Sequence, residues 1–273
     1  MKTFIINLER RQDRKKHIKN FYPKIPILDT EIIKACDGKV PNNNTPEMNI
    51  LCVWLLHTFK RNKVNIYHFK FGEIGCFTSH LSIWKKIIDE DIDKALILED
   101  DITNFHDDYE KVLNEINDIN VSKYNIIYLY NYGPNEDVKH ISEHIISKNY
   151  QDHVQGTYGY VITKDTARFL CNYIKYHYKN TKAIGLDHWF GRILKERTIL
   201  FSTIKLVHTP PSYRERVKRD DNNIYSTDIQ IDEDFLWNKE SLYQSMMNKF
   251  VEKPKVHVNI KPSMDFNNLP RKG

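Results

Sequence analysis

Residues 95–102, ALILEDDI, place a continuous apolar run directly before three consecutive acids, Glu99, Asp100 and Asp101. A run without polar alternation is typical of a strand that is covered on both faces, as in α/β proteins. Carboxylates about 4 Å apart repel each other by about 1 kcal/mol in water and by about 4 kcal/mol at a dielectric near 20. We therefore expect a cation at the end of this strand. The alternative is a solvated strand-to-helix turn in which an Asp caps the helix.

The rest of the chain alternates between strand and helix patterns. Short apolar runs predict strands over 2–8, 25–29, 95–99, 125–130, 156–163, 198–201 and 204–208. Helical spacing or composition predicts helices over 10–20, 46–61, 77–89, 107–117, 164–178 and from Asp187 to about 195, with Thr163 as an N-cap. This alternation predicts an α/β fold with a mostly parallel central sheet flanked by helices. Ligands of such sheets bind at the carboxyl ends of the strands, which is where the three acids lie.

Length and composition restrict the possibilities further. The 273 residues allow one or two domains. We expect one domain over residues 1–220 and a C-terminal extension over 221–273, with a helix at about 238–251 followed by a tail. The net charge of +5 does not argue for nucleic acid and suits an anionic small ligand equally well.

Targeting and cysteine patterns are sparse. The chain has no apolar run of about 18 residues, so we expect no membrane span. The N-terminal apolar stretch is too short for a signal peptide, which favours a cytoplasmic location. The four cysteines lack CxxC spacing, which argues against both a zinc site and a disulfide framework.

Three kinds of site have a strand that ends in acids. A Walker B strand requires a P-loop, which this sequence lacks. A response-regulator pocket would place the acid pair at the first strand and not near residue 100. The third is the acid motif of a nucleotide-sugar glycosyltransferase, in which carboxylates hold Mg²⁺ or Mn²⁺ against a diphosphate. A metal-dependent phosphotransferase or nuclease would require further acids on other strand ends and a stronger positive charge.

Five segments together resemble glycosyltransferase family 25, and the resemblance covers roughly residues 2–210. They are INLERRQDR (6–14), GEIGCFTSHLSIW (72–84), ALILEDDI (95–102), GTYGYVIT (156–163) and LDHWF (186–190). The resemblance implies a GT-A type nucleotide-sugar-binding fold. It also implies inverting transfer of a hexose, often galactose, from a UDP-sugar to a hydroxyl of a glycan or a hydroxylysine-type acceptor, with Mn²⁺ or Mg²⁺ as cofactor.

The same resemblance implies roles for individual residues. Asp187 would be the catalytic base or bind the acceptor, and helix N-capping is the alternative for this residue. The implied metal ligands are Asp101, Asp100 and His208. The implied nucleotide-sugar-binding residues are Asn7, Leu8, Arg10, Arg14, Glu73, Glu99, Asp100, Gly156 and Thr157. His80 lies beside an apolar helix face, and we interpret it as a core histidine.

A second hypothesis comes from another class of protein. The chain would then be a catalytically inactive nucleotide-sugar-binding protein with a structural or interaction role. It would bind the UDP-sugar without turnover. Under either hypothesis we expect no nucleic-acid partner, and a homo-oligomer is possible.

Overall fold

The computed structural model describes eight parts of the chain. They are residues 1–21, 29–62, 70–120, 126–130, 138–148, 156–177, 185–193 and 199–208. The predicted strand residues 25–28, the helix at 238–251 and the whole predicted extension 221–273 lie outside the described residues. None of the helices in these ranges is both long and apolar enough to cross a membrane.

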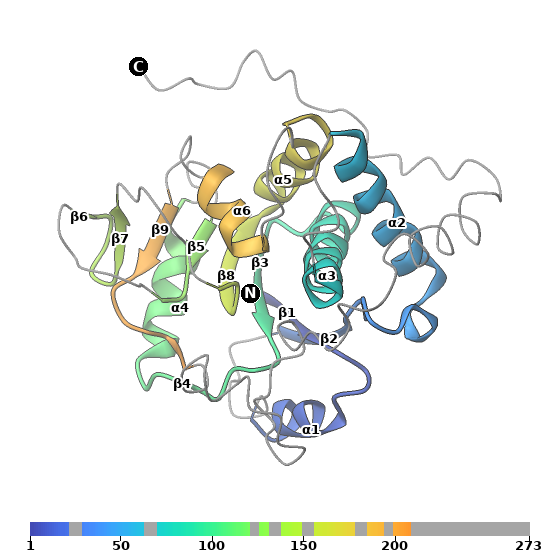
Figure 1. The fold of residues 1–273 in the computed structure, drawn as a ribbon. Helices are drawn as coiled ribbons and strands as arrows, with labels where there is room; N and C mark the ends of the chain where they lie inside the picture. Colours follow the sequence, from blue (N-terminus) through green and yellow to red (C-terminus); the bar gives the residue numbers. More distant parts are fainter. Residues whose placement is uncertain are drawn as a thin grey trace.

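An eight-stranded sheet in the order β2-β1-β3-β8-β5-β9-β7-β6 forms the centre of the described chain (Figure 1). Six of its eight strands run in one direction, and only β7 and β8 run against them, which confirms the mostly parallel sheet. The strands are β1 (Lys2–Asn7), β2 (Asp29–Lys34), β3 (Lys94–Glu99), β5 (Ile126–Tyr128), β6 (Val138–His140), β7 (Ile145–Lys148), β8 (Gly159–Thr163) and β9 (Ile199–Ser202).

Strand β3 has no free edge, because it pairs with β1 on one side and with β8 on the other. The side chains from Ala95 to Leu98 are fully buried, as the unbroken apolar run predicts. Since β1 is parallel to β3 and β8 is antiparallel to it, the carboxyl ends of β1 and β3 meet the amino end of β8. A hydrogen bond of 3.0 Å from the Glu99 N–H to the Tyr158 carbonyl closes this junction.

Helices flank the sheet, as predicted. They are α1 (Gln12–Phe21), α2 (Pro46–Arg61), α3 (Phe71–Asp89), α4 (Tyr109–Asp118), α5 (Lys164–His177) and α6 (Leu186–Ile193), with a short 3-10 turn at Pro41–Asn43. Thr163 caps α5 as predicted, because its Oγ1 accepts the N–H of Thr166 at 3.1 Å. Helix α3 begins six residues before the predicted residue 77, where two glycines obscure the helical pattern.

Several short strands were not predicted. They are β4 (Asn104–Phe105), β6 and β7. Strand β4 pairs with β10 (Val207–His208), which lies within the predicted strand 204–208, and β6 pairs with β7. Each has two to four residues, and its pairing partner is set by the tertiary fold. A periodicity of two cannot be recognised over so few residues.

An aromatic cluster fixes α6 against α3 and β8. The Trp189 ring lies 5.1 Å from Phe77 and 5.9 Å from Trp84, and the Phe190 ring lies 5.5 Å from Tyr160. Such ring pairs contribute about 0.5–1.5 kcal/mol each beyond their buried area. This cluster therefore holds the first turn of α6 close to the end of β3.

Two glycines allow the backbone after β2 to touch α3. A Cβ atom at Gly75 would lie 2.5 Å from the Cys36 carbonyl oxygen and 2.8 Å from the Gly38 nitrogen. A Cβ atom at Gly38 would lie 1.8 Å from the Phe71 carbonyl oxygen. The Ser79 hydroxyl reinforces the contact, since it accepts the Cys36 N–H at 2.8 Å. The segment 36–38 is therefore pressed directly onto α3.

We expect Gly75→Ala to destabilise the protein, because the added methyl group meets backbone atoms that cannot rotate away. The strain should exceed the gain of about 1 kcal/mol in helix propensity, so that the free energy of unfolding falls by about 1–2 kcal/mol. Urea unfolding followed by circular dichroism measures this. Lys85→Ala, on the exposed side of the same helix, is the control and should leave the stability nearly unchanged. Equal stability of the two variants would contradict the contact.

Candidate active site

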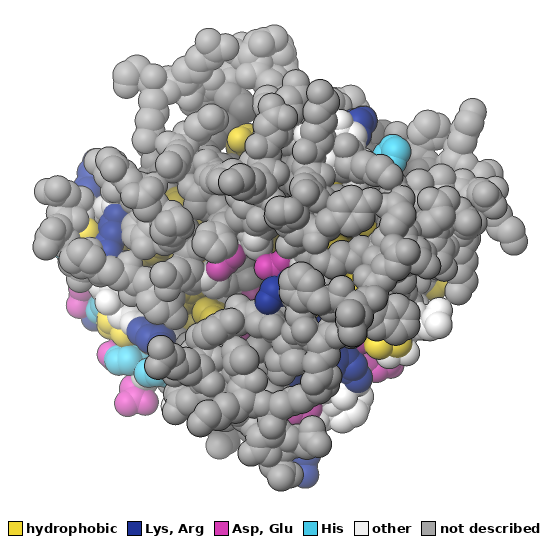
Figure 2. All heavy atoms as spheres, viewed as in Figure 1, with side chains coloured by type: hydrophobic (Ala, Val, Ile, Leu, Met, Phe, Trp, Pro, Cys, Tyr) yellow, Lys and Arg dark blue, Asp and Glu magenta, His cyan; other side chains and the backbone are white. Residues whose placement is uncertain are grey.

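A cavity of about 240 Å³ opens at the junction of β1, β2, β3 and β8 with the first turns of α3 and α6. All of the predicted site residues line it except Asn7 and His208. Acidic and basic side chains lie next to each other near the middle of the face drawn in Figure 2. The prediction of a ligand site beside the acids of β3 agrees with this placement.

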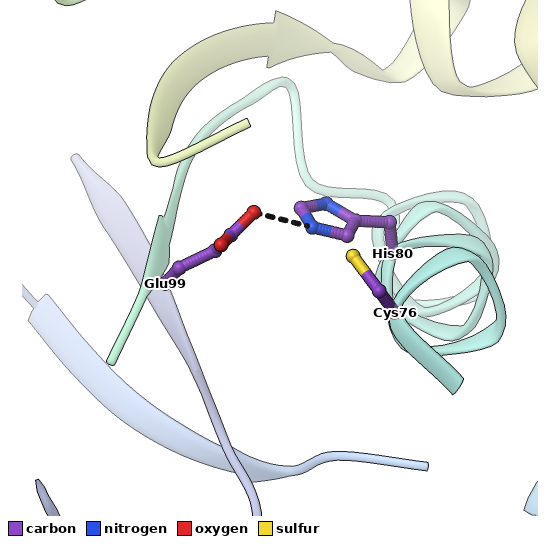
Figure 3. Close-up of side chains that lie close together, drawn as sticks. All are labelled: Cys76, His80 and Glu99. Atoms are coloured by element: carbon purple, nitrogen blue, oxygen red, sulfur yellow. Dashed lines mark ion pairs between the residues drawn. The ribbon is translucent and has the colours of Figure 1, made fainter. Parts of the chain in front are cut away.

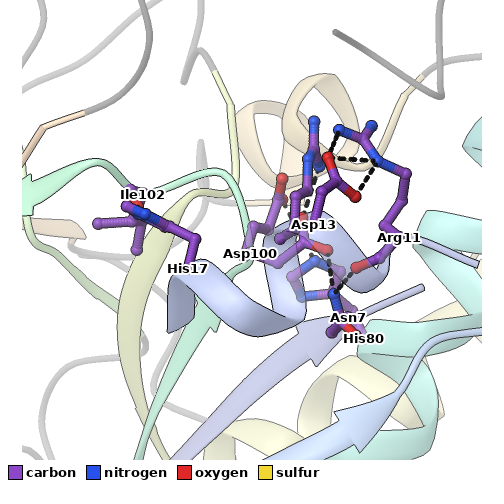
Figure 4. Close-up of polar contacts among 9 residues, drawn as sticks. Asn7, Arg11, Asp13, His17, His80, Asp100 and Ile102 are labelled. Carbon is purple, nitrogen blue, oxygen red and sulfur yellow. Dashed lines mark hydrogen bonds and ion pairs between the residues drawn. The ribbon is translucent and has the colours of Figure 1, made fainter. Parts of the chain in front are cut away.

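Asp100 is the most enclosed of the three acids and binds two partners from the N-terminal segment. Its Oδ1 accepts a hydrogen bond of 2.5 Å from Arg14 Nη1. Its Oδ2 accepts one of 2.8 Å from Asn7 Nδ2 (Figure 4). Burial raises the pKa of the Asp100 carboxyl, while Arg14 and Asn7 oppose that rise. Asp100 and Arg14 therefore form a buried ion pair that joins α1 to the end of β3. Asn7 does not line the cavity itself, but its hydrogen bond holds the Asp100 carboxylate of this pair in place.

Glu99 and Asp101 flank Asp100 in the sequence, and both line the cavity. The Thr157 hydroxyl donates a hydrogen bond to Glu99 Oε1, which fixes the carboxylate against the start of β8. Asp101 follows in the turn after β3 and is only 8% exposed. The end of β3 thus presents carboxylates to the cavity, as the sequence predicts.

Arg10 also lines the cavity, and it is held by an acid that the sequence analysis did not select. Its Nε donates to Asp37 Oδ2 at 2.8 Å. The other Asp37 oxygen accepts the N–H groups of Lys39 and Val40. The Asp-Gly-Lys turn at 37–39 marks this position as a loop in the sequence, but nothing local shows that it faces Arg10.

Glu73 serves the helix on which it lies. Its Oε2 accepts the backbone N–H of Lys70 at 2.8 Å, which satisfies a donor at the start of α3. The same side chain belongs to the cavity lining. The structure therefore shows Glu73 fixing the start of α3, and its contact with the nucleotide-sugar stays a prediction.

Asp187 reaches the cavity from the first turn of α6. Its Oδ2 accepts the N–H of Gly156 at 3.1 Å. Gly156 has a φ of +78° and also accepts a hydrogen bond of 2.7 Å from the Tyr130 hydroxyl. Asp187 lies inside the helix and bonds to a different segment, so this contact is not the helix N-cap that was the alternative prediction. A carboxylate is thereby held in the cavity lining beside the segment that precedes β8.

His208 is placed in β10 and does not belong to the described cavity lining. Its carbonyl group accepts the N–H of Thr103 at 2.8 Å, two residues beyond Asp101. In this contact it is the His208 main chain, and not its imidazole ring, that bonds to the turn after β3. A role for His208 as a metal ligand stays a prediction.

Two residues of α3 complete the cavity and were not predicted as site residues. His80 is fully buried, and its Nδ1 lies 2.6 Å from the Tyr160 hydroxyl. Its Nε2 lies 3.5 Å from Glu99 Oε1 (Figure 3). Cys76 lies one turn earlier on the same helix, and burial, with Glu99 and Asp187, raises the pKa of its thiol well above the usual value. His80 is thus a core histidine, as interpreted, that also reaches the site.

Comparisons with known proteins agree with this geometry. The model of glycosyltransferase family 25 (LPS biosynthesis protein) matches residues 1–185. Procollagen galactosyltransferase 2 of Homo sapiens is 30% identical over 171 residues, which are 61% of this chain and 26% of the relative. A glycosyltransferase 25 family member of Drosophila pseudoobscura pseudoobscura is 36% identical over 132 residues, 46% of this chain and 20% of the relative.

A further relative bears on activity. The probable inactive glycosyltransferase 25 family member 3 of Bos taurus is 27% identical over 174 residues, 62% of this chain and 28% of the relative. The chain therefore spans about a quarter of the length of these curated relatives. The sheet and the cavity at its carboxyl edge define an α/β fold of the GT-A-like glycosyltransferase type. The chain belongs to glycosyltransferase family 25.

We expect Arg14→Met to destabilise the protein strongly, because it leaves the buried Asp100 carboxylate without its cation. Removing one partner of a buried ion pair costs about 3–5 kcal/mol. Loss of the guanidinium raises the pKa of Asp100 further, so the folded variant binds a proton more readily than the unfolded chain. Its stability therefore improves relative to the wild type as the pH falls from 7 towards 5.

Urea unfolding of both proteins across this pH range tests the prediction. Lys111→Met removes one partner of the exposed Lys111–Glu143 pair and should change little at any pH. If the free energy of unfolding of Arg14→Met were only slightly below that of the wild type, or if this difference did not change with pH, the assignment of a charged Asp100 would be contradicted.

Proposed function

We propose that this chain transfers a hexose, galactose in the first instance, from a UDP-sugar to a hydroxyl of a glycan or hydroxylysine-type acceptor. The transfer inverts the anomeric carbon and depends on Mn²⁺ or Mg²⁺. The observation that carries the proposal is the convergence of the β3 acids and Asp187 on one cavity in the family-matched part of the chain. The names of the procollagen galactosyltransferase relatives support the choice of sugar and acceptor.

The charges of the cavity support a need for a divalent cation. The described lining contains six carboxylates and only three basic side chains. An anionic diphosphate would be repelled by this excess unless a cation lay between them. Asp101 offers carboxylate oxygens, which suit Mn²⁺ and Mg²⁺. Asp100 fits this role less well, because both of its oxygens already accept bonds from Arg14 and Asn7.

The proposed chemistry is a single displacement. Asp187 accepts the proton of the acceptor hydroxyl as that oxygen attacks the anomeric carbon, and the Gly156 N–H keeps the carboxylate in place. Arg10 and Lys39 add positive charge to the cavity beside the leaving diphosphate. The divalent cation, when bound, acts as a Lewis acid that offsets charge on the departing UDP.

A second function is favoured by one comparison. The Bos taurus relative that is named as probably inactive matches a similar share of this chain. The chain would then bind a UDP-sugar without turnover and act through its interactions. A screen of UDP-sugars with Mn²⁺, with UDP release as the readout, separates the two functions. Binding of UDP without release of UDP from any donor would favour the inactive protein.

We expect Asp101→Asn to keep the fold and to lose both Mn²⁺-dependent UDP binding and turnover. The amide has the size of the carboxylate but lacks its charge, so it holds a divalent cation poorly. Calorimetric titration of UDP with and without Mn²⁺ measures the effect. Asp93→Asn, at a residue whose side chain is 95% exposed, is the control and should bind as the wild type does. Unchanged UDP affinity in Asp101→Asn would contradict the metal role.

We expect Asp187→Asn to lower kcat by about 10²–10⁴-fold, because the amide cannot accept the acceptor proton. UDP affinity in Mn²⁺ should stay near the wild-type value, since this residue acts on the acceptor. Asp165→Asn provides a matched control, because Asp165 also lies in the first turn of a helix and is exposed. Steady-state rates with the donor found in the screen give the result, and wild-type kcat in Asp187→Asn would exclude it as the base.

A further inference from the structure

We propose that Cys76, His80 and Glu99 form a second cation site, one that takes Zn²⁺ or a similar borderline-soft divalent ion. The site goes beyond the proposed sugar transfer and does not depend on it. Its sulfur, nitrogen and oxygen ligands differ from the all-oxygen ligands expected for Mn²⁺ near Asp101. The sequence did not predict it, because the cysteines lack CxxC spacing and the three ligands come together only in the fold.

The three candidate ligand atoms already lie close together (Figure 3). The Cys76 sulfur, a ring nitrogen of His80 and a Glu99 oxygen are all within 4.8 Å of one another. The distance from His80 Nε2 to Glu99 Oε1 is 3.5 Å. Bonds of about 2.0–2.3 Å in a tetrahedral zinc site place neighbouring ligands about 3.3–3.7 Å apart. Small side-chain rotations are therefore enough to complete the geometry.

Two rigid elements supply the ligands. Cys76 and His80 lie four residues apart on α3 and so share one face of that helix. Glu99 is the last residue of β3, which is paired on both sides. The contact of Gly75 with the segment 36–38 fixes the depth of α3 against the sheet edge. The distance between the helix and strand ligands is thus set by the fold.

The surroundings of His80 provide the second, independent observation. The Tyr160 hydroxyl lies 2.6 Å from Nδ1 and accepts a bond of 3.1 Å from Trp84 Nε1. Nε2 is buried and makes no hydrogen bond to any part of the chain that the structure describes. Metal-binding histidines typically have one ring nitrogen held in this way while the other faces the ion.

The Nε2 atom of His80 can either carry a proton or bind a cation, and the charge of the neighbouring Glu99 bears on both states. If Nδ1 donates to Tyr160, the lone pair of Nε2 faces the Glu99 carboxylate at 3.5 Å, and two acceptors repel each other. A bound cation removes this repulsion, and so does a proton on Nε2. Only the cation draws Cys76 into the same set of ligands. Three protein ligands leave one coordination position for water or for a ligand in the cavity, which Cys76, His80 and Glu99 all line.

Cobalt titration tests the proposal directly, because Co²⁺ can substitute for Zn²⁺ and reports its ligands by colour. We expect the wild-type protein to bind one Co²⁺ with a thiolate-to-cobalt charge-transfer band in the near ultraviolet, and Zn²⁺ to abolish that band. Cys76→Ser should lose the band. Tyr160→Phe should weaken Co²⁺ binding by about 10–100-fold, because it removes the group that orients His80.

Two controls and a second measurement complete the test. Cys171→Ala changes a buried thiol in α5, and Asp101→Asn changes an acid outside the ligand set, so both should keep the band. In unmodified protein, Zn²⁺ should also protect Cys76 from alkylation, as located by peptide mass analysis. The absence of a charge-transfer band in the wild type, or a band that persists in Cys76→Ser, would overturn the site and leave only a proton between His80 and Glu99.

Discussion

The negative charge at the end of a fully buried strand is the constraint that organises this structure. Strand β3 leads into Glu99, Asp100 and Asp101, which are largely buried, and groups from β1, α1 and the segment before β8 offset their charge. Arg14 and His17 tie α1 to Asp100 and to the Ile102 carbonyl, and Thr157 ties the start of β8 to Glu99. The same contacts that compensate the charge therefore assemble the walls of the cavity.

Local patterns were sufficient for most of the longer elements but not for the short strands or for how the elements pair. The run at 95–98 identified a strand covered on both faces, and Thr163 marked the start of α5, because both signals depend on neighbouring residues. The direction of β8 could not be predicted in this way. Its antiparallel pairing with β3 joins residues that are more than sixty positions apart, and the sequence of either strand is compatible with both directions.

For the candidate site, the sequence likewise predicted which residues take part but not which contacts they make. Most candidate residues line the cavity, because motif segments at strand ends converge on one sheet edge. Their contacts could not be foreseen, since Asn7 lies 93 positions from Asp100, and Arg14 turns out to bind the protein's own carboxylate. His80 was hidden for a related reason. Its neighbours on α3 are apolar, and only the tertiary fold shows that one edge of its ring faces Glu99.

The contact between Gly38 and Gly75 limits how this cavity can be redesigned. Where two main chains touch, there is no side chain to shorten, so that wall cannot be moved outward by a point substitution. An engineer who wishes to admit a bulkier ligand must work at other lining positions, such as Tyr158 or Leu186, where side chains supply the volume. The size of this pocket is thus adjustable where side chains line it and set by the backbone where the segment 36–38 meets α3.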